Sequence, residues 1–144
     1  MDDLEEIKNQ VKDLTNALQR LTEALDAEKT DLNRDASIQR FEFCFEIIWK
    51  TLKNINASLG RPCASPRDCL RIAAQTNLLD NPETWFKYLE ARNLASHTYD
   101  EAQAEKVYEK AKEFLPEAQK VLEAVRIKLE LKPIHIPQKG DDRQ

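Results

Sequence analysis

A short polar stretch of the chain, RNLASHTY from Arg92 to Tyr99, carries residue types that can move a proton and hold a phosphate. A neutral imidazole accepts or donates a proton near pH 7, and a guanidinium stays charged and binds phosphate oxygens. Asn93 and His97 are four residues apart, so on a helix the amide can orient the imidazole. His97 as general acid–base, Arg92 as phosphate clamp and Asn93 as orienting residue form a minimal set for metal-independent cleavage of RNA by its 2′-hydroxyl.

The spacing alone has a plainer explanation. An arginine five residues before a histidine is a common coincidence, and a surface histidine satisfied by its neighbours is the simpler interpretation. The side chains of Arg92 and His97 would lie about 140° apart around a helix, so the guanidinium must swing toward the imidazole or toward a symmetry mate. Tyr99 makes the string more specific, although its ring could merely cap a helical bundle.

Other catalytic patterns do not occur in the sequence. It has no Gly-rich phosphate loop, Ser-His-Asp set or paired-carboxylate metal motif, so we expect neither a metal ion nor a cofactor. Cys44, Cys63 and Cys69 form no CxxC pair and have no histidine at ligand spacing. We therefore expect three reduced thiols, with neither zinc nor a disulfide, in a cytoplasmic protein. His135, between two isoleucines, is assigned no role.

Length and composition favour one all-helical domain. The chain has 144 residues, enough for a single core, and only two glycines, few for the turns that sheets require. A formal net charge of −4 argues against attraction of nucleic acid over the whole surface, while a local basic patch remains open. No apolar run approaches the ~18 residues of a membrane span, and the acidic N-terminus is unlike a secretion signal. We therefore expect no membrane partner.

Hydrophobic spacing predicts the long helices. Apolar residues recur with alternating gaps of three and four over 4–25 and again over 38–59, which places each set along one helical face. The second of these segments has further apolar residues on its flanks, so we expect it to lie centrally. Its Glu42, Glu46 and Lys50, each four residues apart, are expected to form a solvated charge ladder.

Capping signals delimit the other helices. Ser65 and Asn81, each followed by proline, predict helices from 66 to about 77 and from 82 to about 97. Asp100 predicts the start of the last helix, and Pro116 inside it predicts a kink or two abutting helices.

Three long helices with a period near 3.5 residues pack at about 20° in up-down bundles. We therefore predict an all-α, up-down bundle of four to five helices over residues 1–131. An extended C-terminal tail with two prolines is expected over 132–144. A coiled coil with a partner helix gives the same hydrophobic pattern, although an intramolecular core is the simpler cause.

Several strings of residues resemble a known family. The string RDASIQRFEF from Arg34 to Phe43, continued by Phe45-Glu46 and Trp49-Lys50, resembles the second helix of the nucleotidyltransferase substrate-binding proteins of the HEPN superfamily. Ser65-Pro66-Arg67-Asp68-Cys69, Trp85 and the stretch 92–101 are similar to the same family. The likeness covers about residues 4–131, and the R-x-x-x-x-H-x-Y string resembles the HepT-type toxins in particular.

This resemblance implies a HEPN-like bundle that forms a homodimer and joins two Arg92/His97 motifs in one composite ribonuclease site, with RNA as substrate. It also implies a cognate minimal nucleotidyltransferase, the antitoxin, that modifies Tyr99 with AMP. The added phosphates would occupy the anion site beside His97 and repel RNA. Two alternatives remain: a non-catalytic substrate-binding subunit of a two-component nucleotidyltransferase, and a plain helical interaction protein.

Overall fold

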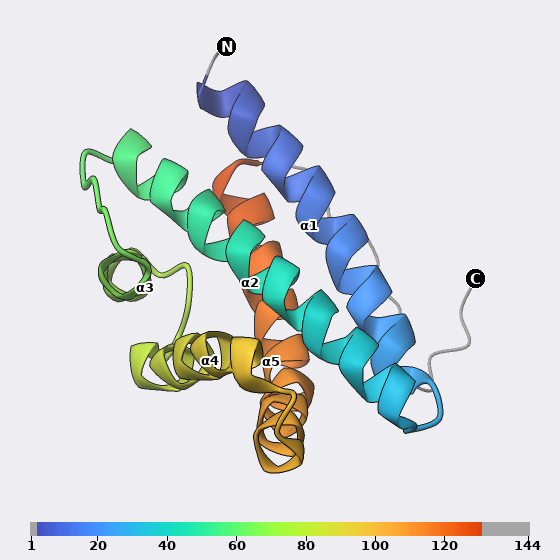
Figure 1. Cartoon of the computed structure of the whole chain (residues 1–144). Helices are drawn as coiled ribbons and strands as arrows, with labels where there is room; N and C mark the ends of the chain where they lie inside the picture. Colours follow the sequence, from blue (N-terminus) through green and yellow to red (C-terminus); the bar gives the residue numbers. More distant parts are fainter. Residues whose placement is uncertain (1–2, 131–144) are drawn as a thin grey trace.

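Five α-helices and one short 3-10 helix make up residues 3–130, the part of the chain that the computed structural model describes (Figure 1). In chain order they are α1 (Asp3–Asp26), α2 (Asp31–Ser58), α3 (Pro66–Gln75), α4 (Pro82–Leu94), the 3-10 helix η1 (Ala95–His97) and α5 (Glu101–Lys128). No strand occurs within this range, so the predicted all-α bundle of four to five helices is confirmed. The predicted tail over 132–144 lies outside the described residues, and the boundary at 131 stays a prediction.

The long helices α1, α2 and α5 form the core. α1 and α2 run side by side along most of their length, α5 packs against both, and the short α3 and α4 cover the remaining side of α2 (Figure 1). α2 contacts all the other helices of the described chain, which confirms its predicted central place. The buried residues of the two apolar stripes predicted over 4–25 and 38–59 are Ile7, Val11, Leu14, Leu18 and Leu21 of α1 and Ile38, Phe41, Phe45, Ile48, Leu52 and Ile55 of α2. α5 buries a third stripe with the same spacing: Val107, Ala111, Phe114, Ala118, Val121 and Val125.

An aromatic cluster fixes α4 on the pair formed by α2 and α5. The ring of Phe114 is fully buried, and its centroid lies 4.9 Å from Phe41, 5.6 Å from Trp85 and 5.5 Å from Tyr88, edge-to-face in each case. Such packing stabilises beyond the burial of apolar area. The cluster therefore holds in place the helix whose last turn begins the 92–99 stretch.

Side-chain caps start four of the helices. Thr30, Ser65, Asn81 and Asp100 have extended backbones, and a side-chain oxygen of each accepts a hydrogen bond from a backbone N–H of the first turn of α2, α3, α4 and α5 respectively. These bonds satisfy N–H groups that a helix leaves free at its start. The predicted starts of the last three helices are confirmed.

The ends and the interior of two helices differ in detail from the prediction. α4 ends at Leu94, and the tighter η1 completes the segment to His97, as 3-10 turns often do at helix ends. α5 continues through Pro116 without interruption, so the alternative of two abutting helices is wrong. Pro116 has no N–H to donate to the backbone carbonyl of Lys112, four residues earlier. Both residues are exposed, so this carbonyl lies on the solvent-facing side of α5.

The prediction of three free thiols is wrong for two of them. Cys63 and Cys69 form a disulfide, with their Cα atoms 5.3 Å apart. The turn into α3 brings Cys63 back against the first turn of that helix, where Asn56 donates a hydrogen bond to the backbone oxygen of Cys69 at 3.1 Å. Cys44 is free and buried, and burial raises the pKa of its thiol.

Candidate active site

The side chain of Arg92 is anchored on α2. Its Nη2 lies 2.7 Å from Oε1 of Glu46, and its Nη1 donates a hydrogen bond of 3.1 Å to Oδ1 of Asn93. The guanidinium carbon lies 5.6 Å from the ring centroid of Phe45, within range of a cation–π contact. The side chain is 26% exposed, so the guanidinium is partly desolvated and held in one orientation.

Glu46 is more than a member of the predicted solvated ladder. Besides Arg92, its carboxylate accepts a hydrogen bond of 3.1 Å from Nε1 of Trp49 and lies 3.7 Å from Nζ of Lys50. Glu42, one turn earlier, is half-buried. Burial raises the pKa of Glu42, the Arg92 guanidinium opposes this rise, and the charge of Glu46 adds to it. Two carboxylates of α2 thus share the surroundings of Arg92.

His97 and Tyr99 lie together in the turn between α4 and α5. Both are exposed, Tyr99 to 86%, and their ring centroids are 6.1 Å apart with an interplanar angle of 71°. The backbone N–H of Asp100 donates to the carbonyl of His97 at 3.2 Å, which closes the turn. The imidazole makes no hydrogen bond with any residue of 3–130 and is open to a ligand.

The predicted site residues therefore form two pairs in one chain. Arg92 and Asn93 form the first, and His97 and Tyr99 the second. The amide of Asn93 accepts from Arg92 and has no hydrogen bond to His97 within the described range. The sequence analysis did not foresee the place of Glu46 beside Arg92. The one available signal was its position in the string that resembles the family.

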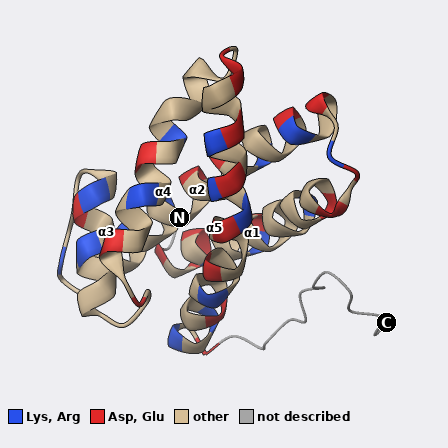
Figure 2. Ribbon diagram, turned by 90° about the horizontal axis from the view of Figure 1, so that it is seen from below, with Lys and Arg blue, Asp and Glu red and all other residues tan. Residues whose placement is uncertain are grey.

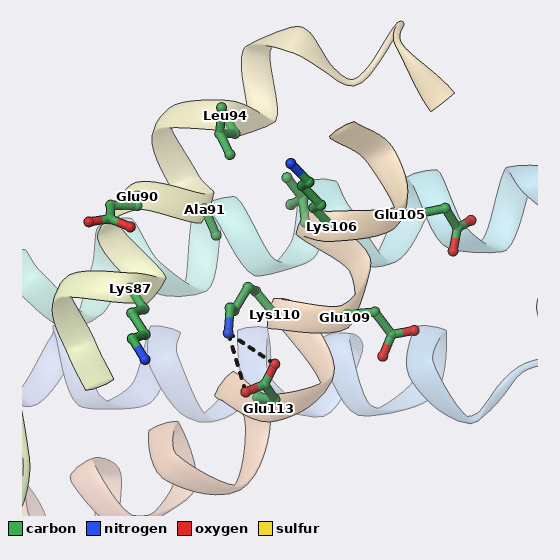
Figure 3. A pocket seen from close by; sticks show the side chains of 10 residues that line it. Lys87, Glu90, Ala91, Leu94, Glu105, Lys106, Glu109, Lys110 and Glu113 are labelled. Atoms are coloured by element: carbon green, nitrogen blue, oxygen red, sulfur yellow. Dashed lines mark hydrogen bonds and ion pairs between the residues drawn. The ribbon is translucent and has the colours of Figure 1, made fainter. Parts of the chain in front are cut away.

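A cavity of about 570 Å³ lies elsewhere, between α4 and α5. Figure 3 shows the apolar residues Ala91 and Leu94 of α4 among lysines and glutamates of α4 and α5, of which Lys110 and Glu113 pair at 3.3 Å. None of the four residues of the predicted site lines it. Its rim carries Lys87, Lys106, Lys110, Glu90, Glu105, Glu109 and Glu113.

The charges are of mixed sign throughout. Figure 2 shows basic and acidic positions interspersed along the helices. Within residues 3–130, no three His, Cys, Asp or Glu side chains are grouped so that they could hold a metal ion. None of the helices in that range has both the length and the apolar content to span a bilayer.

The bundle has a HEPN-like helical fold. The chain belongs to the family described as "Nucleotidyltransferase substrate binding protein like", whose model matches residues 4–127. The membership that the motifs predicted is thereby confirmed.

Three known proteins are similar to this chain. "Probable ribonuclease HepT" of Haemophilus influenzae is 35% identical over 97 residues, which cover 62% of this chain and 65%, slightly less than two thirds, of that relative. A solved structure from Haemophilus influenzae, described as the fold of a substrate binding domain of a nucleotidyltransferase, has a TM-score of 0.65 at 26% identity, and the match covers 85% of this chain and 98% of that chain. A tri-AMPylated Shewanella oneidensis HEPN toxin in complex with MNT antitoxin has a TM-score of 0.71 at 20% identity, and the match covers 88% of this chain and 99% of that chain. This similarity is one of fold.

Proposed function

We propose that this protein is a HepT-like toxin of a toxin–antitoxin pair and cleaves RNA without a metal ion. The observation that carries the proposal is the turn after α4, where an exposed imidazole lies beside an exposed tyrosine and makes no hydrogen bond with residues 3–130. His97 acts as general acid–base on the 2′-hydroxyl and the leaving oxygen. Arg92 binds the scissile phosphate, and Asn93 orients the catalytic groups.

A homodimer completes the site in this proposal. In one chain the guanidinium of Arg92 is directed to Glu46, and no hydrogen bond joins it to His97. A second copy, related by a twofold axis, would bring another Arg92/His97 pair to the same cleft, so that one RNA phosphate meets groups from both chains. Sedimentation at micromolar concentration is expected to give a dimer, and a strict monomer would contradict the composite site.

AMP modification of Tyr99 by a cognate minimal nucleotidyltransferase is the proposed means of neutralisation. The phenol is 86% exposed, so an enzyme can reach its hydroxyl, and the ring lies against His97. Negatively charged phosphates at that position would compete with RNA for the site and repel its backbone. The AMPylated toxin of the same fold, found in complex with its antitoxin, supports this part of the proposal.

A second candidate function is a non-catalytic subunit that presents substrate to a nucleotidyltransferase. The pairing of Arg92 with a carboxylate at 2.7 Å favours it, because that cation is already neutralised within one chain. The description of the Haemophilus influenzae structure as a substrate binding domain also supports it.

Cleavage of purified tRNA and mRNA in the presence of EDTA distinguishes these functions. We expect wild-type protein and the Tyr99→Phe variant to leave 2′,3′-cyclic phosphate ends, and His97→Ala to leave the RNA intact. Incubation with the partner nucleotidyltransferase and ATP is expected to add AMP to His97→Ala but not to Tyr99→Phe. Absence of cleavage by wild-type protein whose mass shows an unmodified Tyr99 would contradict the ribonuclease and favour the substrate-binding subunit.

A further inference from the structure

A buried cation lies at the opposite end of the same turn. The side chain of Arg34, in the first turn of α2, is only 4% exposed although it carries a full positive charge. Its Nη1 and Nη2 donate to the two oxygens of Glu101 at 2.7 and 3.1 Å, and Nη1 also donates to Glu105 at 3.1 Å. Its Nε donates to Asp35 at 3.2 Å. Neither the bundle core nor the proposed chemistry accounts for this arrangement.

The principal partner of Arg34 is joined directly to the candidate site. Glu101 is the first residue of α5, and Tyr99 precedes it by two positions. The N–H of Asp100 in between donates to the carbonyl of His97. The bidentate ion pair therefore fixes the end of the hydrogen-bonded turn that presents the imidazole and the phenol.

The ion pair between Arg34 and Glu101 holds both side chains in a fixed geometry. Removing a guanidinium from water is costly unless several carboxylates surround it, and a two-pronged Arg–carboxylate pair fixes orientation as well as distance. The carboxylates raise the pKa of Arg34 against the effect of its burial. The hydrogen bond and charge of Arg34 lower the pKa of Glu101. Both groups therefore stay charged at neutral pH, and the pair persists.

We propose that Arg34 is a positioning residue for His97 and Tyr99, acting through its bidentate ion pair with Glu101. Arg34 does not touch the substrate. It holds the start of α5 against α2, and so fixes the direction in which the turn presents its two rings. This role rests on the proposed ribonuclease, because a fixed imidazole matters for proton transfer at a defined atom.

Full-length variants separate positioning from plain stability. Glu101→Gln weakens the pair from the exposed side and leaves Arg34 with Glu105 and Asp35, so the bundle is expected to fold. Lys29→Gln is the matched control, because it removes a neighbouring ion pair of 2.7 Å with Glu105 and leaves the contact between Arg34 and Glu101 in place. Each protein is compared at a temperature where circular dichroism shows it fully folded.

We expect Glu101→Gln to lower kcat for RNA cleavage about 10-fold with KM within twofold, since small misplacements of a reacting group are costly. Amide hydrogen exchange over residues 97–103 is expected to become about 10-fold faster, with α1 unchanged. Lys29→Gln should change neither quantity. Equal effects of both variants, or a Glu101→Gln protein with unaltered kcat and exchange, would overturn the proposal.

Failure of the ribonuclease itself has a different signature. If wild-type protein cleaves no RNA, the exchange measurement still tests the ion pair alone. Faster exchange at 97–103 in Glu101→Gln but not in Lys29→Gln supports positioning of the turn, and equal exchange in all three proteins refutes it.

Discussion

The free energy of unfolding lost when the ion pair between Arg92 and Glu46 is disrupted follows from the geometry of the pair. At 2.7 Å the contact is a charge-assisted hydrogen bond, a class that contributes about 1.5–3 kcal/mol when shielded from water. The two side chains are 26% and 37% exposed, so solvent screening reduces this to about 1–2 kcal/mol. For a chain of this length that corresponds to roughly 3–7 °C in Tm.

A double-mutant cycle measures this coupling directly. Wild type, Glu46→Ala, Arg92→Ala and the double variant are unfolded in urea at one protein concentration, and the coupling is the non-additive part of their free energies of unfolding. Glu46→Ala also removes the acceptor of Trp49, but that loss cancels in the cycle. We expect a coupling of about 1–2 kcal/mol.

The pair of Glu117 and Lys120 on α5 is the matched control. Its atoms are 2.9 Å apart, but the lysine side chain is 65% exposed and the residues are three apart on one helix. Its coupling is expected to stay below about 0.5 kcal/mol. A coupling for Arg92 and Glu46 no larger than that of the control would refute the inference that α2 anchors the guanidinium.

Three further expectations concern stability and redox state. Phe114→Ala should lower the free energy of unfolding in urea by about 3–5 kcal/mol, because it empties the centre of the aromatic cluster; a loss below 1 kcal/mol would contradict that packing. The pKa of Glu101 is lower in the folded protein than in the unfolded chain, where it is about 4.3. Ionised Glu101 therefore stabilises the fold at pH values above about 4.3, and this stabilisation is lost as the pH falls through the folded pKa. The gap in Tm between wild type and Glu101→Gln should therefore narrow on acidification from pH 6 to pH 3, and a constant gap would contradict the ion pair. Thiol titration of unfolded, unreduced protein should find Cys44 alone, whereas three thiols would exclude the bond between Cys63 and Cys69.

The helices were predictable because their signals are local. The apolar period places Phe41 and Phe45 on one face of α2 whatever their final neighbours are, and Ser65 and Asn81 can cap a helix using only the next few residues. The passage of α5 through Pro116 was less predictable, because the cost of a proline depends on whether the affected carbonyl faces water or the core.

The candidate site was predictable only where its residues are close in sequence. His97 and Tyr99 share one turn, so their spacing already placed them together. The contact between Arg92 and Glu46 joins two helices, and no periodicity tells an anchored carboxylate from one in a solvated ladder. The disulfide was not predicted, for a related reason. The spacing of Cys63 and Cys69 matches no motif, and only the turn into α3 brings their backbones together.

The segment from Arg92 to Glu101 is attached to α2 at two places. Glu101 pairs with Arg34 near one end of α2, and Arg92 pairs with Glu46 nearer its middle. The two positions are twelve residue steps apart along one continuous helix, which corresponds to about 18 Å. One residue inserted between them would turn one attachment by about 100° relative to the other and lengthen the span by about 1.5 Å. Insertions and deletions over residues 35–45 should therefore be far more damaging than substitutions at exposed positions there.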